Sequence, residues 1–186
     1  MVGSSARRMP AQEGDNQLMV EGVSKRFGGV VAVQDVSLEV PRGAIVSIIG
    51  PNGAGKTSLL NMISGFYKPD TGRVMLEGRD ITQKKPSDIA ALGIARTFQN
   101  IALFSGLTVL DNLMLGRHVR MKSGVIASVI YWGMAQKEDI AHRQACEEII
   151  DFLKLQDLRK QQTAALAYGL RKRVELGRAL ALEPRV

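Results

Sequence analysis

The chain has 186 residues, which is room for one domain or for one domain with an attached lobe. Its formal net charge of +7 is spread along the sequence, so it does not choose between nucleic acid, an anionic membrane and a polyphosphate ligand as partner. No run approaches the roughly 20 apolar residues that span a bilayer, and Cys146, the only cysteine, excludes an internal disulfide.

The first elements predicted are a tail and a hairpin. Residues 1–17 are rich in Ser, Gly, Gln and charge and lack an apolar core, so we expect a disordered tail rather than a secretory signal. Residues 18–40 contain two stretches of alternating apolar residues split by Gly28 and Gly29, which predicts an antiparallel hairpin. A turn at residues 41–43 then leads into the next strand.

The segment at 44–66 predicts a buried strand, a glycine-rich loop and a helix in that order. Residues 44–49 are nearly all apolar, as in a strand that is covered on both faces. Leu59, Met62, Ile63 and Phe66 then recur at helical spacing. Between them, Gly50-Pro51-Asn52-Gly53-Ala54-Gly55-Lys56-Thr57 has the complete pattern of a phosphate-binding loop.

The residue types in this loop suit a nucleotide triphosphate and Mg²⁺. Glycines let successive backbone N–H groups point inward at phosphate oxygens, and the helix N-terminus adds its positive dipole end. Lys56 is expected to reach the β- and γ-phosphates, Thr57 to ligate Mg²⁺, and Ser58 to contact the α-phosphate. The predicted binding residues are therefore Gly50, Asn52, Gly53, Ala54, Gly55, Lys56, Thr57 and Ser58.

The remaining chain predicts short strands and then mostly helices. We expect a turn at 70–72, strands at 74–76 and 94–98, and a short helix at 87–92 that Gly93 ends. Thr108 is the expected N-cap of a helix at 109–115, and further helices are expected at 137–154 and 170–182. Cys146 shares an apolar stripe of the second of these helices, which predicts a core position.

Several motifs stand in the order typical of one family. Gln99 follows a predicted strand, Leu166-Ala167-Tyr168-Gly169-Leu170 precedes a basic helix, and Phe27 lies upstream of the phosphate-binding loop. In this order they resemble the Q-loop, the signature motif and the adenine-stacking aromatic of ATP-binding cassette (ABC) proteins. Residues 95–99, the long insert between Gly116 and Lys137 and the form of the signature resemble the ATPase subunits of branched-chain amino acid transporters.

The resemblance implies an α/β fold: a P-loop NTPase core with a flanking antiparallel β subdomain and a helical subdomain. Residues 18–100 would form the nucleotide-binding core with its antiparallel sheet. Residues 101–165 would form the helical subdomain, and 166–186 the signature motif with a helix returning to the core.

The same resemblance implies site roles and partners. Gln99 would hold Mg²⁺ or position the attacking water, and Phe27 would stack on adenine. The signature would contact ATP bound by a second ABC ATPase subunit, identical or different, and the pair would drive transmembrane permease subunits from the cytoplasmic face of the plasma (inner) membrane.

The sequence departs from the family pattern at two places. Leu170 stands where the signature has Gln, and we expect Gly169 and the helix N-terminus to keep most of that contact. The chain ends at Val186, before the strand that carries the Walker B aspartate and catalytic glutamate. We therefore expect residues 1–186 alone to fold poorly and to turn over little ATP, with truncation and a natural end both open.

Three functions remain open from the sequence. The first is the ATP-binding subunit of an importer of a small solute, branched-chain amino acids being the expected class. The second is a soluble ABC-class ATPase that acts on nucleic acid or the ribosome. The sequence contains no basic stripe interleaved with aromatic residues, so we expect no nucleic-acid partner. The third is an inactive fragment that binds nucleotide only.

Overall fold

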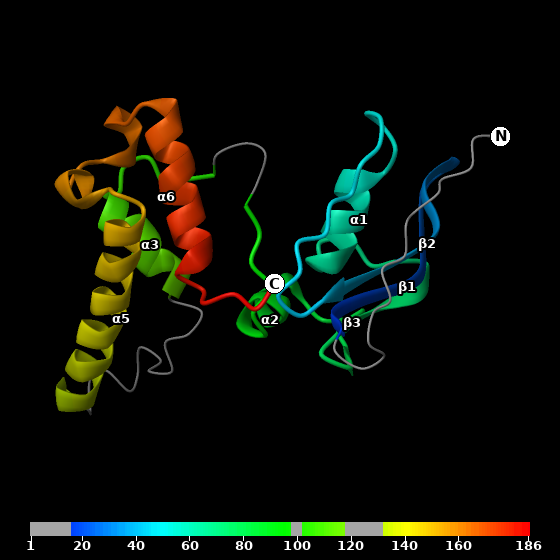
Figure 1. The fold of residues 1–186 in the computed structure, drawn as a ribbon, viewed down its shortest axis with the longest axis horizontal. Helices are drawn as coiled ribbons and strands as arrows, with labels where there is room; N and C mark the ends of the chain where they lie inside the picture. The colour runs from blue at the N-terminus through cyan, green and yellow to red at the C-terminus, as the bar shows by residue number, and fades with distance from the viewer. Residues whose placement is uncertain (1–15, 98–101, 118–131) are drawn as a thin grey trace. The chain divides into compact units, whose positions relative to one another are not determined.

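The fold was analysed in a computed structural model that describes residues 16–97, 102–117 and 132–186, with side chains in the last range from residue 140. Residues 1–15 of the predicted tail 1–17 and Gln99 lie outside the described residues, whereas Asn16 and Gln17, also predicted as tail, belong to the first strand. Contacts divide the chain into two compact units, one ending at Pro86 and the other beginning at Ser87. Each unit is described by itself (Figure 1).

Among its described residues, the first unit contains one antiparallel sheet and the helix that follows the glycine-rich loop (Figure 1). Its elements are β1 (Asn16–Phe27), β2 (Val30–Pro41), α1 (Lys56–Ile63), β3 (Thr71–Leu76) and β4 (Arg79–Asp80). The strands are ordered β2-β1-β3-β4 and neighbours run antiparallel. The predicted hairpin is confirmed, because β1 and β2 pair on either side of Gly28 and Gly29. The strand predicted at 74–76 is longer, since β3 takes in part of the expected turn.

The core of the first unit follows from alternation on its strands. Buried side chains on β1 and β3 pair across the sheet, with Val20 opposite Val74 and Leu18 opposite Leu76. From α1, three of the predicted helical positions are also buried: Leu59, Met62 and Ile63. The fourth, Phe66, is wrong as a helix position, since α1 ends at Ile63 and Phe66 is 53% exposed.

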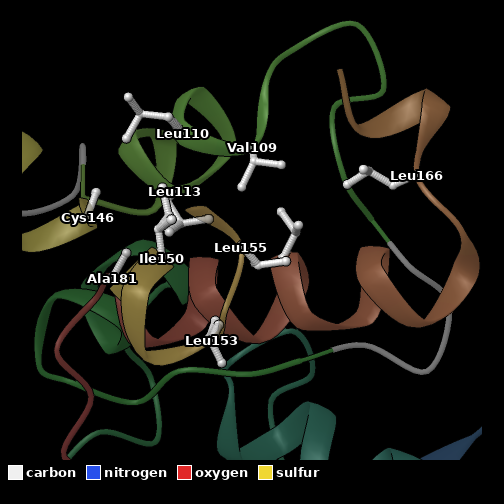
Figure 2. Packing of buried hydrophobic residues seen from close by; sticks show 10 residues of the cluster. Val109, Leu110, Leu113, Cys146, Ile150, Leu153, Leu155, Leu166 and Ala181 are labelled. Carbon is white, nitrogen blue, oxygen red and sulfur yellow. The ribbon is translucent and has the colours of Figure 1, made fainter. Parts of the chain in front are cut away.

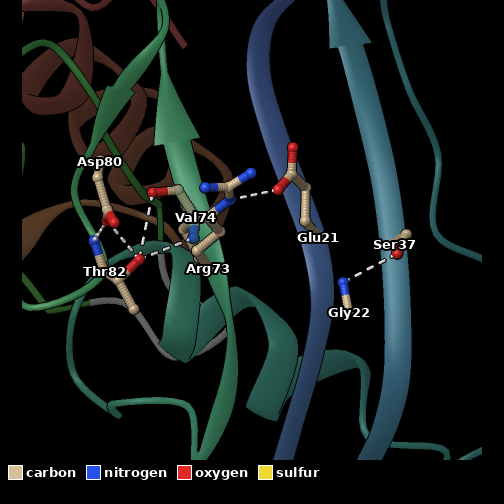
Figure 3. Close-up of polar contacts among 7 residues, drawn as sticks. All are labelled: Glu21, Gly22, Ser37, Arg73, Val74, Asp80 and Thr82. Atoms are coloured by element: carbon tan, nitrogen blue, oxygen red, sulfur yellow. Dashed lines mark hydrogen bonds and ion pairs between the residues drawn. The ribbon is translucent and has the colours of Figure 1, made fainter.

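Polar side-chain contacts connect β1, β3 and the β4 edge of this sheet (Figure 3). The buried Thr82 hydroxyl accepts a hydrogen bond from the Val74 N–H at 2.9 Å and donates one to the Asp80 carboxylate at 2.5 Å. Asp80 also accepts from the Thr82 N–H, and these two bonds lower its pKa below the usual value. Arg73 pairs with Glu21 directly across the β1–β3 ladder. These side-chain contacts add to the backbone pairing of β3 with β1 and with β4.

Two predicted strands are absent. Residues 44–49 have no strand structure, and Ile45 and Ile49 are 97% and 93% exposed. A strand needs neighbours for its backbone groups, and every described strand belongs to the antiparallel sheet, which does not include 44–49. Residues 94–97 also form no strand, although the Ala95 N–H donates to the Val186 carbonyl at 2.9 Å and the Arg185 and Val186 N–H groups donate to the Gly93 carbonyl at 2.7 and 3.1 Å. These three bonds join only residues 93 and 95 to residues 185–186.

The second unit is helical (Figure 1). Its helices are α2 (Pro86–Ala91), which starts at the last residue of the first unit, α3 (Val109–Arg117), α5 (Trp132–Phe152) and α6 (Tyr168–Leu180). The predicted end of α2 at Gly93 is confirmed by a left-handed φ of 102° there. Helices α5 and α6 begin at earlier residues than expected, by five residues for α5 and two for α6.

The start of α3 confirms the predicted cap. The Thr108 hydroxyl accepts from the Asp111 N–H at 3.1 Å, and the Asp111 carboxylate accepts from the Thr108 N–H at 3.3 Å. Both orphan N–H groups are thereby satisfied, as in a capping box. Asp111 also places a negative charge at the positive end of the helix dipole.

One apolar cluster forms the core of the second unit (Figure 2). It joins α3, α5 and α6 through Val109, Leu110, Leu113, Cys146, Ile150, Leu153, Leu155, Leu166, Val174 and Ala181. Cys146 is fully buried as predicted, and this burial raises its pKa to about 11. Gly116 lets α3 approach α6, since a Cβ there would lie 2.5 Å from the Arg178 carbonyl oxygen. Among the helices that the structure describes, none combines the length and apolar content that crossing a bilayer requires.

Candidate phosphate-binding site

The loop at 50–55 curls tightly before α1 begins at Lys56. Gly53 and Gly55 have φ values of 85° and 81°, in the left-handed region that residues with a Cβ rarely adopt. Gly55 is the N-cap of α1, and no side chain caps this helix. The first helical bond runs from the Leu59 N–H to the Gly55 carbonyl at 2.9 Å. The amides of residues 56–58 therefore point along the helix axis toward the loop.

The loop rests directly on strand β2 of the hairpin. A Cβ on Gly55 would lie 2.1 Å from the carbonyl oxygen of Ala32 and 3.2 Å from a methyl group of Val33. No side chain fits at that distance, so glycine is required by close approach as well as by its φ. Sequence reasoning explained the glycine by backbone curvature alone, and the contact with β2 adds a second, independent reason.

Lys56 lies across the loop that precedes it. Its Nζ donates to the carbonyl oxygens of Gly50 and Pro51, each at 2.7 Å. An ammonium group has three protons, so one donor direction is left after these two bonds. The first turn of α1 contains no acidic residue, so no carboxylate of the helix neutralises its positive end. Amide dipoles and an ammonium thus converge on one short loop.

The other predicted loop residues lie on the same turn. Asn52, Ala54 and Thr57 are exposed, and Ser58 is half-buried. A cavity of about 370 Å³ lies between the loop and β2. Its lining comes from Val31, Ala32, Val33, Gln34, Val36, Ile48, Ile49, Ala54, Gly55, Lys56 and Leu59. All of these residues belong to the first unit.

The donor set on the described residues fits Mg²⁺ only in company with phosphate. No group of three or more His, Cys, Asp or Glu side chains comes together in the ranges that the structure describes. The exposed Thr57 hydroxyl on the first turn is a single neutral oxygen ligand. Mg²⁺ keeps waters and takes few protein ligands when it binds with a nucleotide, so one hydroxyl is compatible with it.

The predicted adenine-stacking residue, Phe27, is the last residue of β1. Its side chain is 43% exposed, and its ring contacts the ring of Tyr67 with centroids 5.0 Å apart at an interplanar angle of 70°. The Lys25 Nζ lies 5.7 Å from the Phe27 centroid. Tyr67 was missed by sequence reasoning, because 40 residues separate it from Phe27 and no local motif connects them.

The signature-like segment lies at the start of α6 in the second unit. Ala167 is the N-cap, and its carbonyl accepts from the N–H groups of Leu170 and Arg171, each at 3.0 Å. Leu166 is buried, whereas Tyr168 and Gly169 are exposed on the first turn. Their amides precede the first helical bond and are directed outward along the helix axis.

Leu170, the departure from the family's Gln, has a physical role in this chain. Its side chain is half-buried and packs against the apolar cluster of the second unit. A glutamine there would place an amide group against that cluster, which is unfavourable unless the amide finds hydrogen-bond partners. The structure thus shows that the apolar face of α6 begins within the signature-like segment.

Glu183 and His142 both bind the same buried arginine of the second unit. Arg117, which is buried, donates to His142 Nδ1 and to Glu183 Oε1, each at 2.9 Å, and to the Ala181 carbonyl at 3.3 Å. This arginine ties the end of α3 to α5 and to the residues after α6. Its central role was not visible in the sequence.

Comparison with known proteins identifies the family. The family model described as "ABC transporter" matches residues 33–186. Among curated relatives, the high-affinity branched-chain amino acid transport ATP-binding protein LivG of Salmonella typhimurium is 38% identical over 172 residues. The probable LivG of Methanocaldococcus jannaschii is 40% identical over 169 residues. Each alignment covers 91% of this chain, and the chain spans about two thirds of either relative, 66% of the first and 65% of the second.

Solved structures agree with this similarity. The ADP conformation of an ATP-binding cassette of an ABC transporter has a TM-score of 0.76 and 39% sequence identity. A nucleotide-free ATP-binding cassette has a TM-score of 0.75 at 39% identity, and each comparison covers 91% of this chain and 66% of the solved chain. The predicted fold class, a P-loop NTPase with an antiparallel β subdomain and helices, is thereby confirmed. The chain belongs to the ABC transporter family of ATP-binding cassette proteins.

Proposed function

We propose that the chain binds Mg-ATP at residues 50–58 as the ATP-binding subunit of an ABC transporter. The observation that carries this proposal is the convergence of the α1 N-terminal amides with the Lys56 ammonium on one loop. Both groups are positive, the loop is exposed, and the helix supplies no carboxylate of its own to cancel them. That arrangement suits the tail of a triphosphate.

Mg²⁺ would be held by phosphate oxygens and the Thr57 hydroxyl, with Gln99 as the further ligand that the family pattern implies. The ion would neutralise charge between the β- and γ-phosphates. Thr57 supports this role through its exposed position on the first turn of α1. Gln99 lies outside the described residues, so its role rests on its place in the motif order.

The signature segment would act on a nucleotide held by a second ATPase subunit. Tyr168 and Gly169 are exposed at the start of a 13-residue helix, where free amides suit the γ-phosphate of that nucleotide. Closing of two subunits on ATP and reopening after hydrolysis would move permease subunits at the cytoplasmic face of the plasma (inner) membrane. The similarity to LivG proteins supports branched-chain amino acids as the imported solutes.

Replacement of Lys56 tests whether its ammonium group contributes to Mg-ATP binding. Lys56→Ala removes a charge-assisted contact, and we expect a loss of about 1.5–3 kcal/mol in Mg-ATP affinity, or about 10- to 150-fold in Kd. Isothermal titration calorimetry measures the change. Lys85→Ala is the matched control, because Lys85 is an exposed lysine of the same unit away from the loop. Equal affinity in wild type and Lys56→Ala would remove the assignment of this loop.

Affinity purification separates the transporter function from its alternative. Recovery of polytopic membrane subunits with the tagged protein is expected for an importer. Recovery of nucleic acid or ribosomes, abolished by nuclease, would instead support a soluble ABC-class ATPase that acts on them. The net charge of +7 is compatible with that alternative, and the 38% identity to a transport protein favours the importer.

A further inference from the structure

The end of strand β1 is held by one residue that follows α1. Asp70 accepts a hydrogen bond from the Lys25 ammonium at 2.6 Å and another from the Arg26 N–H at 2.8 Å. Its own N–H donates to the Ser24 carbonyl at 2.8 Å. Three consecutive residues before Phe27 are therefore fixed by Asp70. The bonds to Lys25 and Arg26 also lower the pKa of Asp70, so its carboxylate is ionised when it makes them.

The next contact reaches Phe27 itself. Tyr67, three residues before Asp70, places its ring at 70° to the Phe27 ring with centroids 5.0 Å apart, the edge-to-face arrangement that aromatic pairs prefer. Lys25, which Asp70 holds, lies 5.7 Å from the same ring. Phe27 is nevertheless 43% exposed, so part of its ring surface remains open beside these neighbours.

The segment that makes these contacts is attached to the helix of the phosphate-binding loop. The Tyr67 N–H donates to the Asn61 carbonyl in α1 at 3.1 Å. At its other end, Phe27 pairs with Val30, whose neighbour Val31 lines the cavity that Lys56 also lines. Loop, helix and Phe27 thus belong to one connected piece of the first unit. The cavity wall at Val31 is thus next, along β2, to the residue that pairs with Phe27.

We propose that Tyr67 and Asp70 are positioning residues for base recognition: they hold the open surface of Phe27 as a stacking platform for the purine of the bound nucleotide. This inference rests on the proposed function, because it requires a nucleotide with its phosphates at residues 50–58. Stacking is sensitive to the orientation of the aromatic ring, and a ring fixed before binding does not lose rotamer freedom on binding. Tyr67 fixes the ring, and Asp70 fixes the backbone that carries it.

Two ligands that differ only in the base separate this role from general support of the loop. Calorimetry with Mg-ATP and with Mg-tripolyphosphate would be carried out on the full chain and its Tyr67→Leu variant. We expect Tyr67→Leu to raise the Kd for Mg-ATP about 2- to 10-fold, the size of an aromatic-pair interaction. The Kd for tripolyphosphate should stay the same. Tyr67→Phe keeps the ring pair and should restore wild-type affinity for both ligands.

Other results would overturn the inference. Unchanged ATP affinity in Tyr67→Leu, or equal weakening of both ligands, would show that Tyr67 does not position the base platform. If Phe27→Leu also leaves ATP affinity unchanged, the base stacks elsewhere, and the inference fails while the proposed function stands. If the wild-type chain, shown to be folded by circular dichroism, binds neither ligand, the proposed function itself fails.

A second variant covers the case in which Tyr67→Leu does not fold. Asp70→Asn keeps the size of the side chain and removes the charge that holds Lys25. It should show the same selective loss of ATP affinity with tripolyphosphate binding retained. Glu77→Gln is its control, because Glu77 carries the ion pair with Arg42 at the opposite end of the sheet's strands. Equal ATP affinity in Asp70→Asn and wild type would overturn the inference.

Discussion

Apolar residues are buried in the helices of the second unit but exposed at residues 44–49 of the first unit. In the second unit, the apolar stripes of α3, α5 and α6 meet one another, and Leu113, Cys146 and Ile150 are fully buried. In the first unit, residues 44–49 are as apolar but form no strand, and Ile45 is 97% exposed. The three helices bury one another's apolar faces, and all three come from the same unit. A central strand, in contrast, needs neighbouring strands to pair with its backbone. Hydrophobic pattern predicts which face is available for burial, and a partner decides whether burial occurs.

A matched pair of truncations tests this difference most directly. Leu113→Ala should destabilise the protein by about 2–5 kcal/mol, because it leaves a cavity in the closed core of the second unit. Ile45→Ala should change stability by less than about 0.5 kcal/mol, since that side chain contacts mainly water. Urea unfolding followed by circular dichroism measures both changes. A loss above about 2 kcal/mol for Ile45→Ala would show that this stretch is covered in solution and would break the comparison.

The closure of the helical core also has a pH signature. Burial raises the pKa of the Cys146 thiol from 9.0, the value of a free thiol, to about 11, because a buried site disfavours the thiolate. Above pH 9.0 the unfolded chain loses this proton first, so stability falls between pH 9.0 and about 11. At about pH 10 the loss should be about 1.4 kcal/mol relative to neutral pH.

Comparison with Cys146→Ala isolates this thiol from other groups that titrate in the same range. The variant lacks the ionising group, so the stability difference between wild type and variant should shrink as pH rises from about 8 to about 10. Urea midpoints at a series of pH values provide the measurement. A constant difference across that range would mean that the thiolate is hydrated in the folded state, contrary to its burial.

The smallest expected effect concerns helix starts, where the two units also differ. Helix α3 is capped by Thr108 and carries Asp111 in its first turn, whereas α1 has neither a side-chain cap nor an acidic residue there. Thr108→Ala should cost about 1 kcal/mol, because it leaves the Asp111 N–H without its acceptor. Thr97→Ala, an exposed threonine outside any helix, is the control. Equal stability of the two variants would show that solvent replaces the cap at no cost.

The conformation of the glycine-rich loop and the helix after it were predictable because their sequence signals are local. Glycine spacing, the lysine and the helix that follows lie within a few residues, and each lies where the sequence indicated. Thr108 was predictable for the same reason. The start of α6 at Tyr168 was not, because its N-cap, Ala167, has no side chain that could indicate a helix start.

Features that depend on distant residues could not be derived from the sequence. Tyr67 and Phe27 meet only because β3 pairs with β1 and returns the segment after α1 to the hairpin. Arg117 joins two residues that lie 25 and 66 positions away in the chain. The missing strand at 94–97 has the opposite cause: local preference predicted it, and its backbone lacks a continuous ladder among the described residues.

The contact of Gly55 with Ala32 offers a natural spectroscopic probe. Because the Ala32 carbonyl oxygen and a Val33 methyl group lie against Gly55, a movement of the loop around an anion should shift the peptide unit between Ala32 and Val33. The amide resonance of Val33 should therefore shift when phosphate is added. A resonance of strand β2 would then detect anion binding at a loop more than 20 residues further along the sequence.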